Sequence, residues 1–262
     1  MAKITWRNLS LVFTAAFFIS ACGGSGGSTS LAGGGTTTNA SPGGIWSGTE
    51  SSTGLTVTGI VDEAGEFRFI RSDGTQYVGT ATTVENAISA SFDGYTPIGT
   101  MFADGSTHGT GTLSGTVTQR VSISAMTQFQ TDKGTSSSGS LSLTFESLYN
   151  VASSLATISG NYTDPNSGDV ISITSSGAVT WQDAETGCVG NGTISIISAT
   201  YNAYRVQFSY GNCTGGAAVL NGAQFTGLAT LDNAVSPEQA IVGVTGQGNG
   251  TTYALVLTLN RS

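Results

Sequence analysis

Apolar and polar residues alternate along most of the chain beyond residue 45. The alternation is clearest in six runs, at residues 55–58, 67–70, 121–124, 141–145, 204–210 and 253–257. A period of two places successive side chains on opposite faces of a strand, so each run predicts a β-strand with one buried face. Residues 146–156 form the best candidate for a helix. Turn-forming pairs separate the strands, among them Asp73-Gly74, Asp93-Gly94, Asp104-Gly105 and Asn221-Gly222.

The two halves of this strand-rich region resemble each other. Residues 65–69 align with 177–181, 113–116 with 225–228, and 141–145 with 253–257, all at an offset of 112 residues. Gly44-Ile-Trp46 aligns with Gly160-Asn-Tyr162 at an offset of 116. Four anchors in the same order indicate an internal repeat, with chance similarity between glycine-rich strands as the alternative.

Each half has room for about eight short strands, the number that a small up-and-down barrel or sandwich needs. The sequence therefore predicts an all-β protein built from two tandem antiparallel β-barrel or sandwich repeats. It leaves open whether the halves form two barrels or one larger sheet system.

The first 22 residues differ from the rest. Lys3 and Arg7 precede an apolar run at residues 9–19, which is too short to cross a hydrocarbon core of ~30 Å and predicts a secretory signal. The following Ile19-Ser20-Ala21-Cys22 resembles the lipobox of bacterial lipoproteins. This resemblance implies that Cys22 is the lipid attachment site; an ordinary signal peptide with an unmodified cysteine is the alternative.

The residue after the cysteine refines the expected location. Gly23 stands where an Asp would favour the inner membrane, so the resemblance implies a lipid-anchored protein of the outer membrane. The body would then face either the periplasm or the cell surface. Several acyl chains on one residue give stable membrane attachment.

A linker rich in Gly, Ser and Thr follows the cysteine. Residues 23–44 carry no charge and one large aliphatic side chain, Leu31, so we expect a flexible tether. The expected divisions of the chain are a signal peptide at 1–21, a lipidated cysteine with its linker at 22–44, a first β repeat at 45–148 and a second at 149–262.

Lipidation of Cys22 leaves two of the three cysteines, Cys188 and Cys213, in an oxidising compartment. We expect a disulfide between them. The alternative, a metal site, needs further ligands, and the single histidine, His108, lies in the other half of the chain.

The expected disulfide constrains the hairpin formed by residues 189–198 and 203–212, which turns near Thr200-Tyr201. Direct pairing at a residue-number sum of 401 would place the apolar residues of the two strands on opposite faces. A bulge at Gly211-Asn212 would restore the match.

Charge excludes some classes of partner. The formal net charge is −8, and it becomes −10 without Lys3 and Arg7. A chain this acidic offers no basic patch, so we expect no nucleic acid partner. Only 9% of residues are charged, so Ser, Thr, Asn and Gly must supply much of the solvated surface.

No arrangement of residues predicts a catalytic or metal centre. His108 lies in a sequence typical of a turn, and Asp62, Glu63 and Glu66 flank a predicted turn at Ala64-Gly65. Residues 164–169 begin like a calcium loop but place Gly and Asp out of order. We therefore expect a protein that is not an enzyme and that uses no cofactor and no metal.

Two further resemblances concern the body of the protein. Gly44-x-Trp46 resembles the opening of lipocalin and avidin-like barrels, in which the Trp packs across the barrel floor. The order of lipidated cysteine, tether and β modules resembles surface lipoproteins such as transferrin-binding protein B and factor H-binding protein. The segment from Leu148-Tyr149 to Thr186-Gly187-Cys188 is similar to proteobacterial lipoproteins of unknown function.

These observations predict a non-catalytic binding module for a protein, a glycan or a small apolar ligand. A structural or assembly component of the envelope is the alternative, and a hydrolase is a remote third. A ligand inside the barrels would contact interior aromatic residues, for which the candidates are Trp46, Phe67, Phe69 and Trp181.

Overall fold

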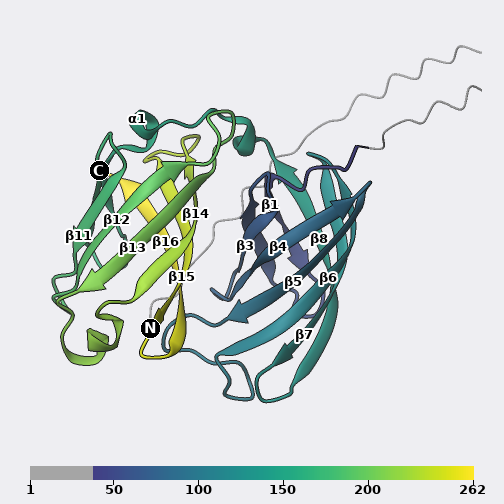
Figure 1. The fold of residues 1–262 in the computed structure, drawn as a ribbon, viewed down its shortest axis with the longest axis horizontal. Helices are drawn as coiled ribbons and strands as arrows, with labels where there is room; N and C mark the ends of the chain where they lie inside the picture. The colour runs from purple at the N-terminus through teal and green to yellow at the C-terminus, as the bar shows by residue number, and fades with distance from the viewer. Residues whose placement is uncertain (1–37) are drawn as a thin grey trace, which may run out of the picture.

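The computed structural model describes residues 38–262, which form two closed antiparallel β-barrels of eight strands each (Figure 1). The predicted lipid attachment site, Cys22, and the predicted signal peptide lie outside the described residues. In both barrels each strand pairs with its neighbours in sequence, and the last strand closes on the first. The first barrel consists of β1 (Gly44–Glu50), β2 (Thr56–Val61), β3 (Glu66–Arg71), β4 (Gln76–Val84), β5 (Ala87–Tyr95), β6 (His108–Thr118), β7 (Ser122–Thr131) and β8 (Ser136–Glu146).

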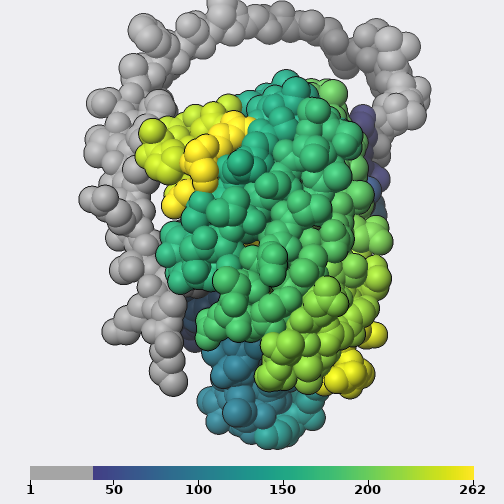
Figure 2. All heavy atoms as spheres, turned by 90° about the vertical axis from the view of Figure 1, so that its left-hand side faces the viewer, coloured from purple at the N-terminus to yellow at the C-terminus, as the bar shows by residue number. Residues whose placement is uncertain are grey.

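The second barrel repeats this up-and-down order. Its strands are β9 (Gly160–Thr163), β10 (Val170–Ile173), β11 (Ala178–Gln182), β12 (Val189–Ile196), β13 (Tyr204–Gly211), β14 (Gln224–Asp232), β15 (Gln239–Gly248) and β16 (Thr251–Arg261). Figure 2 looks onto this barrel, where atoms of the teal and green part of the chain cover the face.

The prediction of two tandem all-β repeats is confirmed. The anchors of the repeat lie on equivalent strands of the two barrels: β3 and β11, β6 and β14, β8 and β16, and β1 and β9. The halves form two separate closed barrels, which resolves the question that the sequence left open.

The candidate helix at residues 146–156 forms only in part. The chain makes a 3-10 turn, η1 (Ser147–Asn150), and then a single helical turn, α1 (Leu155–Ile158). Between them, Ser153 hydrogen-bonds to the carbonyl groups of Ser198 and Ala199 in the second barrel, which holds this stretch extended. The side chain of Ser154 caps α1 by accepting a bond from the amide of Thr157.

The last residues of the expected linker belong to the first barrel. Ala40 forms two hydrogen bonds at the end of β4. Its amide donates to the Glu85 carbonyl, and its carbonyl accepts from the Thr83 hydroxyl. Pro42 accepts a bond of 2.9 Å from the indole of Trp46. Residues 39–43 therefore pack against one end of the barrel. There the Pro42 carbonyl provides the acceptor that the buried indole N–H needs.

The two barrels contact each other through buried polar side chains of the first barrel. Gln76 is fully buried, and its amide donates to the Leu255 carbonyl at 2.7 Å and to the Val244 carbonyl at 3.3 Å. Arg68, 6% exposed, donates to the Thr226 carbonyl. From the second barrel, Arg205 forms ion pairs with Glu66 at 2.6 Å and with Asp62 at 3.3 Å.

An apolar cluster also joins the two barrels and includes a residue of the segment that connects them. It combines Ile45, Ile60 and Tyr149 with Ala203 and Leu228 of the second barrel. The ring of Tyr149 stacks on that of Tyr201 at 4.9 Å. Burial of both apolar and polar groups indicates that the two barrels pack as one body. Among the described residues, no helix has the length and hydropathy to cross a membrane.

Replacing Gln76 with Ala should lower the free energy of unfolding by about 1–3 kcal/mol, because two buried carbonyl groups lose their donor across the interface. Chemical denaturation measures this change. Gln128→Ala is the matched control, since Gln128 is exposed on the outer face of β7, and it should change stability little. Equal stability of the two variants would contradict the contact described here.

Candidate functional site

The interior of the first barrel is filled by side chains. Three of the four candidate aromatic residues lie here: Trp46 is fully buried, and Phe67 and Phe69 are 1% and 4% exposed. The ring of Trp46 packs edge-on against Phe145 at the covered end of the barrel. The remaining void among Phe67, Phe69 and their neighbours is only about 10 Å³, which is too small for an organic ligand.

The other end of the first barrel is also closed. Glu50 points into the barrel with 5% exposure and forms an ion pair with Arg71 at 3.4 Å. Arg71 also donates to the hydroxyl of Tyr77 at 3.0 Å. Phe102, from the loop between β5 and β6, packs against the ring of Phe129. These side chains occupy this end of the interior.

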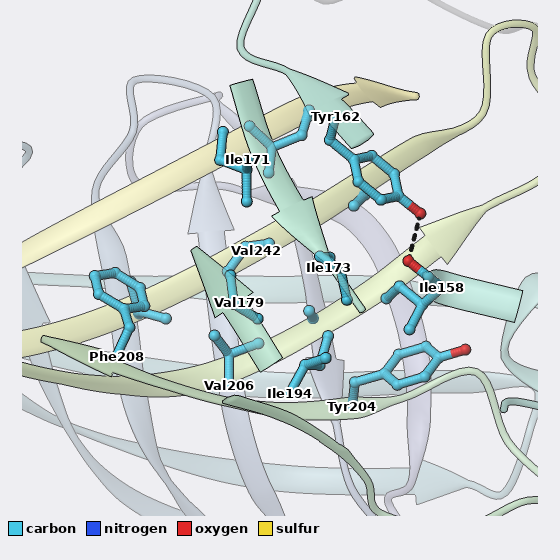
Figure 3. Packing of buried hydrophobic residues seen from close by; sticks show 14 of the residues in the cluster. Ile158, Tyr162, Ile171, Ile173, Val179, Ile194, Tyr204, Val206, Phe208 and Val242 are labelled. Atoms are coloured by element: carbon cyan, nitrogen blue, oxygen red, sulfur yellow. Dashed lines mark hydrogen bonds between the residues drawn. The ribbon is translucent and has the colours of Figure 1, made fainter. Parts of the chain in front are cut away.

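The second barrel, in contrast, contains a cavity of about 250 Å³. Figure 3 shows apolar side chains of this barrel, among them Ile171, Val179 and Val206, pointing into its interior. Its walls are apolar, and they include Ile171, Ile173, Val179, Val206, Val242, Leu257 and Leu259.

The cavity has a floor at the end where the chain enters the barrel. Ile158, the last residue of α1, is fully buried and lines the cavity. The hydroxyl of Tyr162 donates to the Ile158 carbonyl at 2.9 Å, as the dashed line in Figure 3 shows. This bond ties the helical turn to β9 and satisfies a buried carbonyl.

Two equivalent inward positions carry a smaller side chain in the second barrel than in the first. At the repeat offset of 112, Phe67 of β3 corresponds to Val179 of β11, and Val117 of β6 corresponds to Ala229 of β14. Phe67 and Val117 are buried in the core of the first barrel, whereas Val179 and Ala229 line the cavity. Both changes remove side-chain volume from a barrel of the same strand number.

Trp181, the fourth candidate aromatic residue, lines the cavity near its mouth. Its indole lies across Gly190 of the neighbouring strand, where a Cβ atom would come within about 2.0 Å of the ring. Any larger residue at position 190 would therefore collide with the indole of Trp181 in this orientation. The ring meets that of Tyr210 edge-on, with 5.3 Å between centroids.

Three aspartates surround the mouth of the cavity. Asp164 and Asp169 come from the loop between β9 and β10, and Asp183 comes from the loop between β11 and β12. The Asp183 carboxylate accepts hydrogen bonds from the amides of Glu185 and Thr186 and from the Thr186 hydroxyl. Although partial burial raises the pKa of Asp183, these bonds outweigh it and lower the pKa below its usual value, so the group is ionised at neutral pH.

The mouth has no basic residue to balance these carboxylates. All six cationic side chains within residues 38–262 bond elsewhere: five arginines to other carboxylates, and Lys133 to the Asp104 carbonyl. The pKa of Tyr210 is raised to about 12. Burial is the main cause, and the negative charges of Asp183, Asp169 and Asp164 add to it. The cavity is thus an apolar space behind a negatively charged entrance.

The expected disulfide between Cys188 and Cys213 is present at the same end of the barrel. The strands β12 and β13 pair at a residue-number sum of 400, so Ile194 lies opposite Val206 on the inner face. The ladder therefore keeps the apolar residues in phase as far as Gly211, where direct pairing at 401 would have placed them on opposite faces. The extra residue is Asn212, in the left-handed region at φ 60°, which agrees with the bulge expected at Gly211-Asn212.

The other sequence candidates serve as turns and contacts. Gly65 adopts φ 90° in the predicted turn, and Asp62 accepts bonds from the turn amides of Ala64 and Glu66. Residues 164–169 form a turn in which Asp164 accepts from the amide of Asn166. No group of three or more metal-ligating side chains occurs within the described part of the chain.

His108 lies on the outside of the first barrel between two carboxylates. Its Nε2 is 3.0 Å from Asp93 and its Nδ1 is 2.9 Å from Asp132. Partial burial lowers the pKa of His108, but the bonds to Asp93 and Asp132 outweigh this and raise the pKa above its usual value. The sequence signal for this cluster was absent, since the three residues come from β5, β6 and the loop after β7.

No family model and no curated protein shows significant similarity to the chain. The function of the cavity therefore has to follow from its own geometry.

Removing the disulfide by Cys188→Ala with Cys213→Ala should lower the free energy of unfolding by about 3 kcal/mol, since the bond closes a loop across 25 positions. Denaturation without reductant measures the difference. A reducing agent should destabilise the wild-type protein and leave the double variant unchanged. Equal stability of both proteins without reductant would count against the bond.

The stabilisation from His108 should depend on pH. Because the folded-state pKa is raised, the stabilising charge is fully present below the unfolded value of about 6.5 and is lost as pH rises through the folded pKa. The difference in unfolding free energy between wild type and His108→Gln should therefore shrink as pH rises from 5.5 to 8.5. An NMR titration of the ring that gives a pKa below 6.5 would refute this.

Proposed function

We propose that this protein is a lipid-anchored binding protein of the bacterial outer membrane, and that its second barrel holds a small apolar ligand. The observation that supports this most strongly is the apolar cavity of about 250 Å³ in the second barrel beside a first barrel that is filled. Binding sites for small molecules are commonly concave, largely apolar and already formed in the free protein.

The size of the cavity limits its ligand. At ~30 Å³ per water-sized group, the space takes about eight non-hydrogen atoms. This matches a short aliphatic chain or a small ring, or the buried end of a longer molecule whose remainder stays outside. The mouth residues Asp164, Asp169 and Asp183 leave the entrance polar.

In this proposal the remaining parts of the chain anchor and support the binding barrel. The lipobox at residues 19–22 supports anchoring through Cys22, and the Gly- and Ser-rich residues that follow support a tether. The first barrel, with both ends closed, packs on the second through Gln76 and Arg68. In this proposal the first barrel is structural.

The proposal is non-catalytic. Asp183 is committed to hydrogen bonds within its own loop, and its lowered pKa is the reverse of what a general acid at neutral pH needs. Asp164 likewise accepts bonds from Asn166 in its own turn.

A second candidate function is contact with another envelope protein or with a glycan through the outer face of the first barrel. On β6 and β8 the outward residues are almost all Ser or Thr, and between β4 and β8 this face has an open depression of about 710 Å³. Cross-linking in intact membranes from Ser138→Cys tests this candidate: a specific adduct supports it, and a monomeric pattern opposes it.

Filling the cavity should abolish ligand binding. Val179→Phe restores the larger residue that the first barrel has at the equivalent position, and its ring has an empty space to enter. We expect affinity for 1-octanol, a neutral probe of suitable length, to fall at least tenfold by isothermal titration calorimetry. The full chain carrying Cys22→Ser, purified without detergent, avoids competition from added amphiphiles.

Val170→Phe provides the matched control, because Val170 is 49% exposed on the outside of the same barrel. It adds the same atoms without entering the cavity, so octanol affinity should stay unchanged. Ala125→Leu in the filled first barrel should instead cost about 1–3 kcal/mol of stability through overpacking. Octanol binding that survives Val179→Phe would contradict a site inside the second barrel.

A further inference from the structure

From the charge and the aromatic residues at its mouth, we infer that the cavity of the second barrel selects amphiphilic cations: ligands with a short apolar body and an ammonium group. This inference rests on the proposed function and specifies the ligand class. Three arrangements in the second barrel support it.

The first arrangement is the position of the carboxylates relative to the apolar walls. Asp164, Asp169 and Asp183 line the same cavity as Ile171, Val179 and Leu259. A molecule that buries an aliphatic chain against these walls therefore places its polar end among the aspartates.

The second arrangement is the lack of compensating charge. The six cationic side chains of residues 38–262 are bonded away from this mouth. Carboxylates held around an entrance with low-dielectric walls attract a cation and repel an anion. The side chain of Asp169 makes no hydrogen bond in the described structure, which leaves its carboxylate available to a ligand.

The third arrangement is the aromatic lining below the carboxylates. Trp181 and Tyr210 meet edge-on near the mouth of the cavity, where its lining changes from apolar to acidic residues. Aromatic faces within about 6 Å attract ammonium groups. A bound alkylammonium would thus have its chain against the aliphatic walls and its ammonium group near the aromatic rings and the carboxylates.

The same geometry argues against a metal ion as the cation. The three aspartates do not form a group close enough to hold a metal, and no such group occurs among residues 38–262. Carboxylates distributed around a mouth suit a larger, diffuse organic cation whose hydrogen atoms reach several acceptors.

A matched series of probes with an octyl tail tests the inference: octylammonium, 1-octanol and nonanoate at pH 7. The alkyl tails are equal, and the head groups carry a positive, a zero and a negative charge. We expect octylammonium to bind on the order of tenfold more tightly than octanol, and nonanoate on the order of tenfold more weakly, by titration calorimetry. The preference should decrease with added salt.

Asp169→Asn and the pair Asp164→Asn with Asp169→Asn should reduce the preference for octylammonium and leave octanol affinity unchanged. Asp232→Asn is the control, since it removes one negative charge from the opposite end of the same barrel. It should leave all three affinities unchanged.

The outcomes separate the two claims. If octanol binds and octylammonium binds no more tightly, the proposed function stands and the cation inference is overturned. If none of the three probes binds to the folded protein, both are overturned. A preference for octylammonium that survives the Asn variants also overturns the assignment to these aspartates.

Discussion

The space inside a closed barrel is set by the number and tilt of its strands, so the volumes of the inward side chains decide whether the interior is full. Both barrels of this protein have eight strands in the same order. At two equivalent inward positions the second barrel has the smaller side chain, Val179 for Phe67 and Ala229 for Val117, and its interior holds the cavity. The filled and the hollow barrel thus share one fold and differ in their inward side chains.

The contacts between the barrels give the filled barrel a role. Gln76 and Arg68 of the first barrel donate hydrogen bonds to carbonyl groups of the second. Arg205 of the second barrel forms an ion pair with Glu66 of the first. Buried hydrogen-bonded groups are costly to leave unpaired, so they favour one relative position of the barrels. This packing covers β14, β15 and β16 and leaves the cavity mouth at the loops of the second barrel.

Much of the fold could be predicted from the sequence because alternation with a period of two is a direct consequence of strand geometry. The repeat offset of 112 residues also identified equivalent strands correctly. The bulge expected at Gly211-Asn212 is also present, because Asn212 shifts Cys213 by one residue relative to the ladder of β12 and β13. Residues such as Arg68 and Gln76 have the pattern of solvent-facing strand positions, so the interface had no local signal.

The site could be predicted only in part. Trp181 was a candidate, but Trp46, Phe67 and Phe69 proved to be core residues of the closed barrel. The sequence pattern around the aspartates at the mouth predicts turns, and the structure has turns there. The fold of the barrel brings residues 164–169 and Asp183 to the same cavity, which the local sequence does not indicate. Inward volumes change in both directions between the repeats, since Val179 is smaller than Phe67 but Phe225 is larger than Leu113, so they did not indicate the hollow barrel.

The central claim is that one barrel is hollow and the other is filled, and xenon is a direct probe because it enters dry apolar cavities. A crystal of the protein pressurised with xenon should show xenon density between Val179 and Ala229 in the second barrel and none beside Phe67 in the first. Density in both barrels, or in neither, would contradict the account.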